Sequence, residues 1–256
     1  MTVIHDPFFY LMAVPAILIA GVSKGGFGGG LGVVAVPLLT LAVSPVQAAA
    51  VMLPILCFMD LFGVWAYRGK WDRANLRIML PASIVGIVIG ALLFRHLTAA
   101  HIRLIVGVIA VGFTLRYWLG ASGRTPEPRP RSWLRGGFWS GTAGFTSFVS
   151  HAGGPPVGVY LLPQRLDKTV YQATTVIFFI TVNYVKLVPY TLLGQFTPGN
   201  LGTSLALLPL AFAGMALGIW LHHRVSERRF FQVCYVLLFL TGLKLLYDGL
   251  SSLGSL

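Results

Sequence analysis

The chain has 256 residues, of which 56% are hydrophobic and only 10% are charged, and its mean hydropathy is +0.79. Soluble domains carry roughly 25% charged residues, so this composition excludes a soluble globule. The formal net charge of +12 does not indicate a nucleic-acid partner, because the basic residues lie mainly in short gaps between apolar runs. The runs are long enough to cross a bilayer as helices. We therefore predict an all-α polytopic integral membrane protein that contacts lipid and binds no nucleic acid.

The first apolar segment, 8–41, contains a glycine-rich stretch. Five of the six residues at 25–30 are glycine, and each costs about 1 kcal/mol in a helix interior relative to alanine, so we expect two short helices around a break. A break at membrane depth exposes N–H groups at the start of the next half-helix, where the helix dipole favours an anion. The predicted ligands are Ser23, Lys24, Gly28, Gly29 and Gly30. Two alternatives stay open: glycines that serve close helix packing, and a lysine that snorkels to the membrane surface.

Three uninterrupted apolar runs follow, at 46–67, 76–94 and 102–119, and each predicts a full transmembrane span. Asp60 is the one carboxylate placed well inside a predicted span. It is either a protonatable group that couples transport to an ion, or the partner of a nearby basic residue. Gln47, near the start of the first run, is a further candidate ligand.

A second interrupted segment, 137–163, again predicts two short helices, here around Gly153 and Gly154, which two prolines follow. Proline suits the first turn of a helix, where its missing N–H is not needed. The candidate ligands of this break also include Ser147 and His151. His151 either donates to the anion or carries a proton, or else it is a hydrogen-bonded structural histidine. Paired breaks of this kind point to a binding site near the bilayer midplane.

Three further spans are predicted at 170–193, 201–221 and 230–250. The first of them carries a stripe of side chains that recur every three or four residues. The stripe consists of Gln172, Thr175, Phe179, Asn183, Lys186 and Tyr190. Because a lipid-facing lysine is costly, the stripe should face the protein interior. Gln172, Asn183 and Lys186 are therefore candidate substrate ligands, with interhelical hydrogen bonding as the alternative.

Cys57 and Cys234 both lie inside apolar runs, which favours buried packing over a disulfide or a metal pair. Lys244 and Asp248 are four residues apart and should form a helix-surface ion pair. We expect no metal and no cofactor.

The two halves of the chain align with each other. The matching residues, at offsets of 125 and then 128, are Gln47 with Gln172, Asn75 with Asn200, Gly86 with Gly214, and Gly90 with Gly218. This alignment predicts a first repeat at 1–120, an Arg- and Pro-rich linker at 121–135, and a second repeat at 136–256.

The loop charges predict the orientation of these repeats. If both interrupted segments return to the side on which they began, 14 Lys and Arg residues fall on one side and 2 on the other, whereas single crossings would give 9 and 7. The positive-inside rule favours the returning form, with the linker in the cytoplasm and both termini outside. The first repeat then begins outside and the second begins inside. Such inverted repeats are common in secondary transporters that work by alternating access.

The two interrupted segments, Gly21–Pro37 and Gly141–Pro163, are each followed by a span that starts near Gln47 or Gln172. Over essentially the whole chain this pattern resembles the sulfite exporter TauE/SafE family, although the second break has a short insertion around 148–152. The resemblance implies two four-segment repeats in the cytoplasmic membrane. It also implies transport of sulfite, sulfonates or related sulfur-containing anions.

The residues and the resemblance together predict a secondary transporter that exports a small sulfur-containing anion. The chain has no Walker pattern, so the membrane potential or an ion gradient would drive it. A transporter or channel for another small ion, including a cation, is the alternative, but Asp60 is the one acidic residue available to it. An intramembrane enzyme that uses Ser150 and His151 is disfavoured, because adjacent residues are poorly placed as nucleophile and base. Whether the protein forms a homodimer stays open.

Overall fold

The computed structural model describes residues 3–29, 32–93, 99–120 and 128–254, with only part of the side chains of α2, α5 and α10. These residues form α-helices, one short 3-10 turn and no strand. The elements are α1 (Pro7–Gly26), α2 (Gly32–Leu39), α3 (Pro45–Ala66), α4 (Arg73–Leu93), α5 (Ala99–Gly120), α6 (Trp133–Ser150), α7 (Gly154–Leu161), η1 (Leu162–Gln164), α8 (Lys168–Leu192), α9 (Pro198–Arg224) and α10 (Glu227–Gly254). Gly30 lies outside the described residues, as does 121–127 of the predicted linker. Helix α6 begins at Trp133, two residues before the predicted end of the linker.

Several helices begin where a polar side chain caps free backbone N–H groups. Ser44 accepts from the N–H of Gln47 at the start of α3, and Thr197 accepts from that of Asn200 at the start of α9. In both cases a proline occupies the next position, where no N–H is needed. The sequence thus marks the start of one helix in each half of the chain.

Six described helices are long and apolar enough to cross a membrane: α1, α3, α4, α8, α9 and α10. The chain is therefore a multi-pass membrane protein. The predicted span at 102–119 forms helix α5. Many side chains of α5 lie outside the described part, and α5 is not among these six helices. The prediction of two short helices at 8–41 is wrong for α1, which continues for 20 residues to Gly26.

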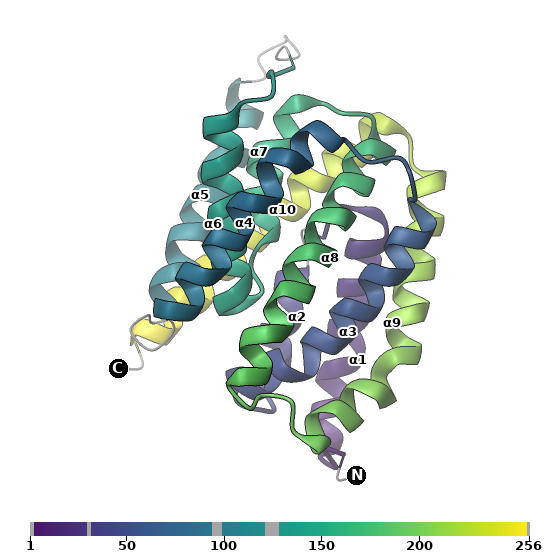
Figure 1. Ribbon diagram of the computed structural model, residues 1–256, viewed down its shortest axis with the longest axis vertical. Coiled ribbons are helices and arrows are strands. Elements are labelled where there is room, and N and C mark those ends of the chain that lie inside the picture. The colour runs from purple at the N-terminus through teal and green to yellow at the C-terminus, as the bar shows by residue number, and fades with distance from the viewer. Residues whose placement is uncertain (1–2, 30–31, 94–98, 121–127, 255–256) are drawn as a thin grey trace.

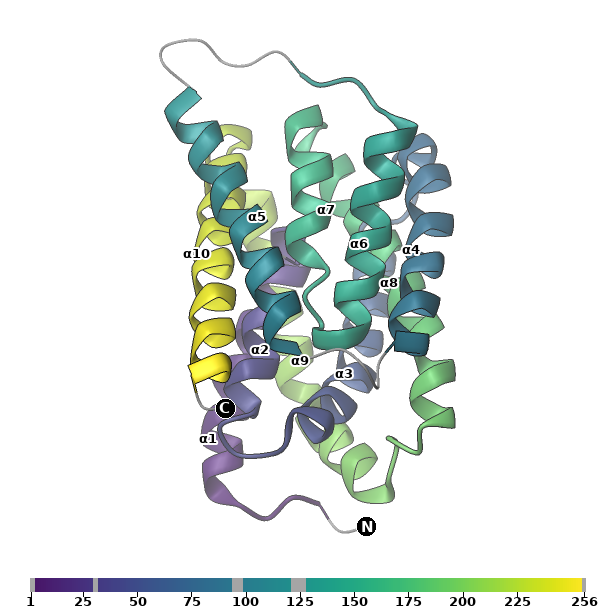
Figure 2. The same cartoon turned by 90° about the vertical axis from the view of Figure 1, so that its left-hand side faces the viewer.

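The two interrupted segments form helical hairpins. α6 runs down from the upper end of the molecule and α7 turns back toward it, while α1 rises from the lower end and α2 leads back to the start of α3 (Figure 2). The N- and C-terminal ends lie at the lower end of the molecule, and the end of α5 and the start of α6 lie at the upper end (Figures 1 and 2). The ends of the linker thus lie opposite the chain termini.

Helix packing follows the same pattern in both halves. α1 packs along α9, and α6 packs along α4; α3 and α8 lie side by side at the centre, and α5 pairs with α10 (Figure 1). Large apolar side chains such as Leu92, Leu192 and Leu205 are exposed on the outside. In a membrane protein this outer surface faces lipid.

Glycine allows the close packing of α1 against α9 and of α4 against α6. A Cβ on Gly26 would collide with the carbonyl oxygen of Gly218 on α9, and a Cβ on Gly86 would collide with that of Gly141 on α6. Close packing, one of the two interpretations left open for the glycine-rich stretch, therefore holds for its helical part. It also explains why α1 extends through glycines that are unfavourable in a helix: they bring two backbones into contact.

Candidate functional site

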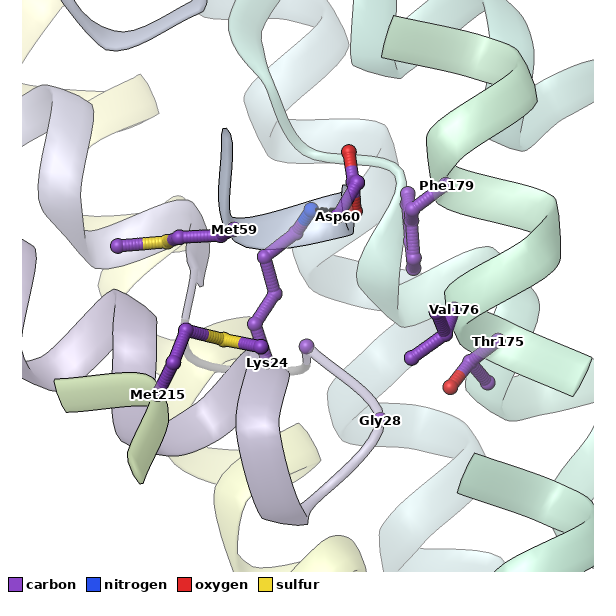
Figure 3. Close-up of a pocket in the computed structure, with 9 residues that line it drawn as sticks. Lys24, Gly28, Met59, Asp60, Thr175, Val176, Phe179 and Met215 are labelled. Atoms are coloured by element: carbon purple, nitrogen blue, oxygen red, sulfur yellow. Dashed lines mark hydrogen bonds and ion pairs between the residues drawn. The ribbon is translucent and has the colours of Figure 1, made fainter. Parts of the chain in front are cut away.

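Two adjoining cavities lie at the centre of the molecule, among the ends of α1 and α6 and the middles of α3 and α8. Lys24, Gly29 and Phe179 line both of them. The first cavity is completed by Gly28, Met59, Asp60, Thr175, Val176 and Met215 (Figure 3). The second is completed by Leu56, Ser147, His151, Gly154, Asn183 and Lys186. The structure thus brings together eight of the predicted site residues from both halves of the chain, in addition to Asp60.

Lys24 reaches from α1 to the carboxylate of Asp60 on α3 (Figure 3). Its Nζ forms an ion pair with Asp60 Oδ1 and also lies 3.5 Å from the carbonyl oxygen of Leu56. The side-chain amide of Asn183 donates to the other carboxylate oxygen at 2.6 Å. Of the two interpretations of Asp60, pairing with a basic residue is therefore confirmed. The snorkelling interpretation of Lys24 is wrong in this structure, since its side chain is buried.

Lys186 is the most deeply buried cation of the site, with no exposed surface. Its Nζ donates to the backbone oxygen of Ser147 at 3.2 Å and to its hydroxyl oxygen at 3.1 Å. Both partners are neutral, and within the described part of the chain no carboxylate pairs with this amine. The positive charge of a protonated Lys186 is therefore not balanced by the protein around it.

His151 lies in the turn between α6 and α7, where it ends α6 in a left-handed conformation with φ of 54°. Its side chain is only 9% exposed, and neither ring nitrogen has a hydrogen-bond partner among the described residues. No side-chain hydrogen bond of normal geometry within the described part of the chain supports the interpretation of His151 as a hydrogen-bonded structural residue, although the backbone oxygens of Ser147 and Ala49 lie near its ring. Because buried polar atoms normally have partners, these two nitrogens are candidate contacts for a ligand.

The turn after α1 is held by Gln172 of α8. Its side-chain oxygen accepts from the N–H of Gly28 at 2.6 Å, and its nitrogen donates to the carbonyl oxygen of Lys24 at 2.5 Å. The N–H of Gly29 donates to the carbonyl oxygen of Ser23. The predicted anion cradle at Gly28 and Gly29 is therefore not available in this conformation, because both N–H groups already have partners within the protein.

The remaining predicted ligands lie beside the cavities. Ser23 and Gly153 are buried but line neither cavity. Gln47 is at the start of α3, where its amide donates to Asn200 of α9 at 3.3 Å. Gln47 lines neither cavity. Gly154 lines the second cavity, but α7 offers few free N–H groups at its start, because the next two residues are prolines.

The polar stripe of α8 faces inward, as predicted, and all six of its residues are buried. Phe179, named in the stripe but not as a site residue, turns out to line both cavities, with its ring centroid 5.8 Å from Lys24 Nζ. Sequence reasoning also missed Tyr67 and His222, which hold the end of α1. Tyr67 donates to the carbonyl oxygen of Gly25 at 2.6 Å, and a ring nitrogen of His222 lies 3.1 Å from the carbonyl oxygen of Gly26.

Two further predictions are confirmed. Cys57 and Cys234 are buried and form no disulfide. Lys244 and Asp248 form the expected ion pair on α10. Among the described residues no group of three or more His, Cys, Asp or Glu side chains could hold a metal ion.

These features describe a small, buried site with hydrogen-bond donors, two lysines against one carboxylate and an aromatic wall, inside a multi-pass membrane protein. The comparisons with known proteins agree with that picture. No curated protein and no solved structure gives a significant match. A family model described as sulfite exporter TauE/SafE, however, matches residues 13–245. The chain therefore belongs to the sulfite exporter TauE/SafE family.

Proposed function

We propose that this protein is a secondary transporter that exports sulfite, a sulfonate or a related small sulfur-containing anion across the cytoplasmic membrane. The observation that carries the proposal is Lys186, a fully buried amine with neutral partners only. A buried charge without a counter-charge is costly, and within a membrane such residues usually mark a substrate path. A small anion in the second cavity would supply the missing charge.

Other groups around this cavity suit an anion. His151 presents ring nitrogens without partners, and Asn183 and Ser147 lie on the same wall. Leu56 and Phe179 give the cavity an apolar side that can accept the carbon chain of a sulfonate. Among the described side chains of both cavities, the one carboxylate is Asp60, and Lys24 already neutralises it.

The transport mechanism that we propose is alternating access between two inverted repeats. The equivalent contacts of α1 with α9 and of α6 with α4 support this division, as do the two central helices α3 and α8. Each repeat contributes to the site: Lys24 and Asp60 come from the first, and His151 and Lys186 from the second. A rocking motion of one repeat against the other would therefore open the site to each side in turn.

We further propose that the linker is cytoplasmic and that both termini are outside. Exposed Arg131 and Arg135 at the linker end, with Arg68 and Lys70 after α3, would then face the inside. An inside-negative potential would favour export by about 2.3 kcal/mol per 100 mV for each negative charge moved. No ATP-binding motif is needed for such export.

Flux through purified protein tests this function. Proteoliposomes loaded with sulfite should release it faster than protein-free vesicles, and an inside-negative potential should accelerate the release. The sulfite collected outside should be chemically unchanged. Loss of sulfite without flux would indicate an enzyme, and a cation current that is independent of sulfite would indicate a cation channel; either result would contradict the proposal.

A further inference from the structure

The charges of the site bear on which anion it takes. We infer that the site selects a monovalent oxyanion, such as a sulfonate or hydrogensulfite, over a divalent one, and that Asp60 sets this preference. The inference rests on the proposed function, since it concerns the substrate class of the same site.

The charge inventory of the interior is short. Among the described side chains, the buried lysines, arginines and carboxylates are Lys24, Lys186 and Asp60. With both lysines protonated and Asp60 ionised, two positive charges and one negative charge leave a net charge of one positive unit. In a poorly solvated site, a ligand that brings the total to zero is favoured, because any remaining charge interacts strongly with its low-dielectric surroundings. One negative charge achieves this balance, whereas a second would be uncompensated.

Two side chains hold the carboxylate of Asp60 at the site. Lys24 binds one carboxylate oxygen, and Asn183 donates to the other. The side chain is 2% exposed, so solvent does little to screen it. Because Lys24 and Asn183 also line the second cavity, the carboxylate lies one residue behind the wall that an anion would touch. From that position it weakens the attraction of Lys24 for an anion and leaves Lys186 as the uncompensated cation.

His151 fits a monovalent ligand as well. A neutral imidazole offers one donor and one acceptor. The donor suits a charged oxygen of the ligand, and the acceptor suits the protonated oxygen of hydrogensulfite. Neither interaction requires a second negative charge on the ligand.

Two anions of fixed charge test the inference. Methanesulfonate and sulfate share a tetrahedral shape and nearly the same size, but they carry one and two negative charges. We expect purified wild-type protein to bind methanesulfonate more tightly than sulfate. The Asp60→Asn variant keeps the size of the side chain and raises the net charge of the site to two positive units, so the ratio of the two affinities should shift toward sulfate by about tenfold or more.

Two further variants keep the result interpretable. The double variant Lys24→Met with Asp60→Asn returns the net charge to one and leaves no unpaired Lys24, so it should restore the wild-type preference even if Asp60→Asn alone folds poorly. Asp248→Asn removes a carboxylate that lies on α10, outside both cavities, and should leave the ratio unchanged.

The outcomes separate this inference from the proposed function. Tighter binding of sulfate than of methanesulfonate by the wild type would overturn the inference alone. An unchanged ratio in folded Asp60→Asn protein, or a double variant that fails to restore the preference, would do the same. If folded wild-type protein bound neither of these anions and also failed to bind sulfite, the proposed function itself would fall.

Discussion

Replacement of Lys186 by methionine should separate binding from folding. The substitution preserves chain length and apolar volume while it removes the charge. In the structure it deletes two hydrogen bonds to Ser147, at 3.1 and 3.2 Å, and also the desolvation cost of a fully buried amine. These contributions oppose each other, so we expect the free energy of unfolding to change by less than about 2 kcal/mol.

Anion affinity should respond very differently. A hydrogen bond to a charged group contributes about 1.5–3 kcal/mol, which corresponds to roughly 10- to 150-fold weaker binding when it is lost. Isothermal titration of sulfite into the purified variant gives this number, and thermal unfolding of the same sample gives the stability. Lys244→Met is a matched control, because it removes a lysine that is paired on α10 away from both cavities. Wild-type affinity in folded Lys186→Met protein would refute the reasoning.

Three further predictions concern packing, the turn after α1 and orientation. Gly86→Ala should destabilise the protein by about 1–3 kcal/mol in thermal unfolding, because its Cβ collides with α6, whereas Gly112→Ala, which has no atom within 4 Å of the new Cβ, should not. Gln172→Leu leaves two buried backbone groups without partners, so we expect the free energy of unfolding to fall by about 2 kcal/mol or more and proteolysis near the α1–α2 turn to become faster. Unchanged proteolysis would count against the role of this residue. A cysteine at exposed Arg131 should resist an impermeant thiol reagent in intact cells if the linker is cytoplasmic, and rapid labelling would reverse the orientation.

Periodic features were predictable from the sequence. The inward face of α8 follows from polar residues at helical spacing together with the cost of exposing a lysine to lipid, and this part of the site needs no knowledge of the other helices. The starts of α3 and α9 were marked by serine or threonine before proline. Each of these features depends on residues that are close together in the sequence, so it can be predicted without knowing the fold.

Pairings across the fold were not predictable in the same way. No sequence pattern near Gln172 indicates that its side chain accepts from the N–H of Gly28, which lies 144 residues earlier. This hydrogen bond occupies a donor on which the predicted anion cradle relied. The ion pair of Lys24 with Asp60 likewise depends on how α1 packs against α3. The length of α1 was underestimated because the helix cost of glycine was counted, while its gain in backbone packing against α9 was not.

The most direct test of an anion site at Lys186 is the position of a bound anion. Selenite has the shape of sulfite, and its selenium atom can be located by anomalous X-ray scattering from crystals soaked at saturating concentration. The account predicts a selenium peak in the second cavity, with an oxygen within hydrogen-bond distance of Lys186 Nζ, and no such peak in the Lys186→Met variant. A cavity that stays empty of selenium, or an equally strong peak in the variant, would contradict it.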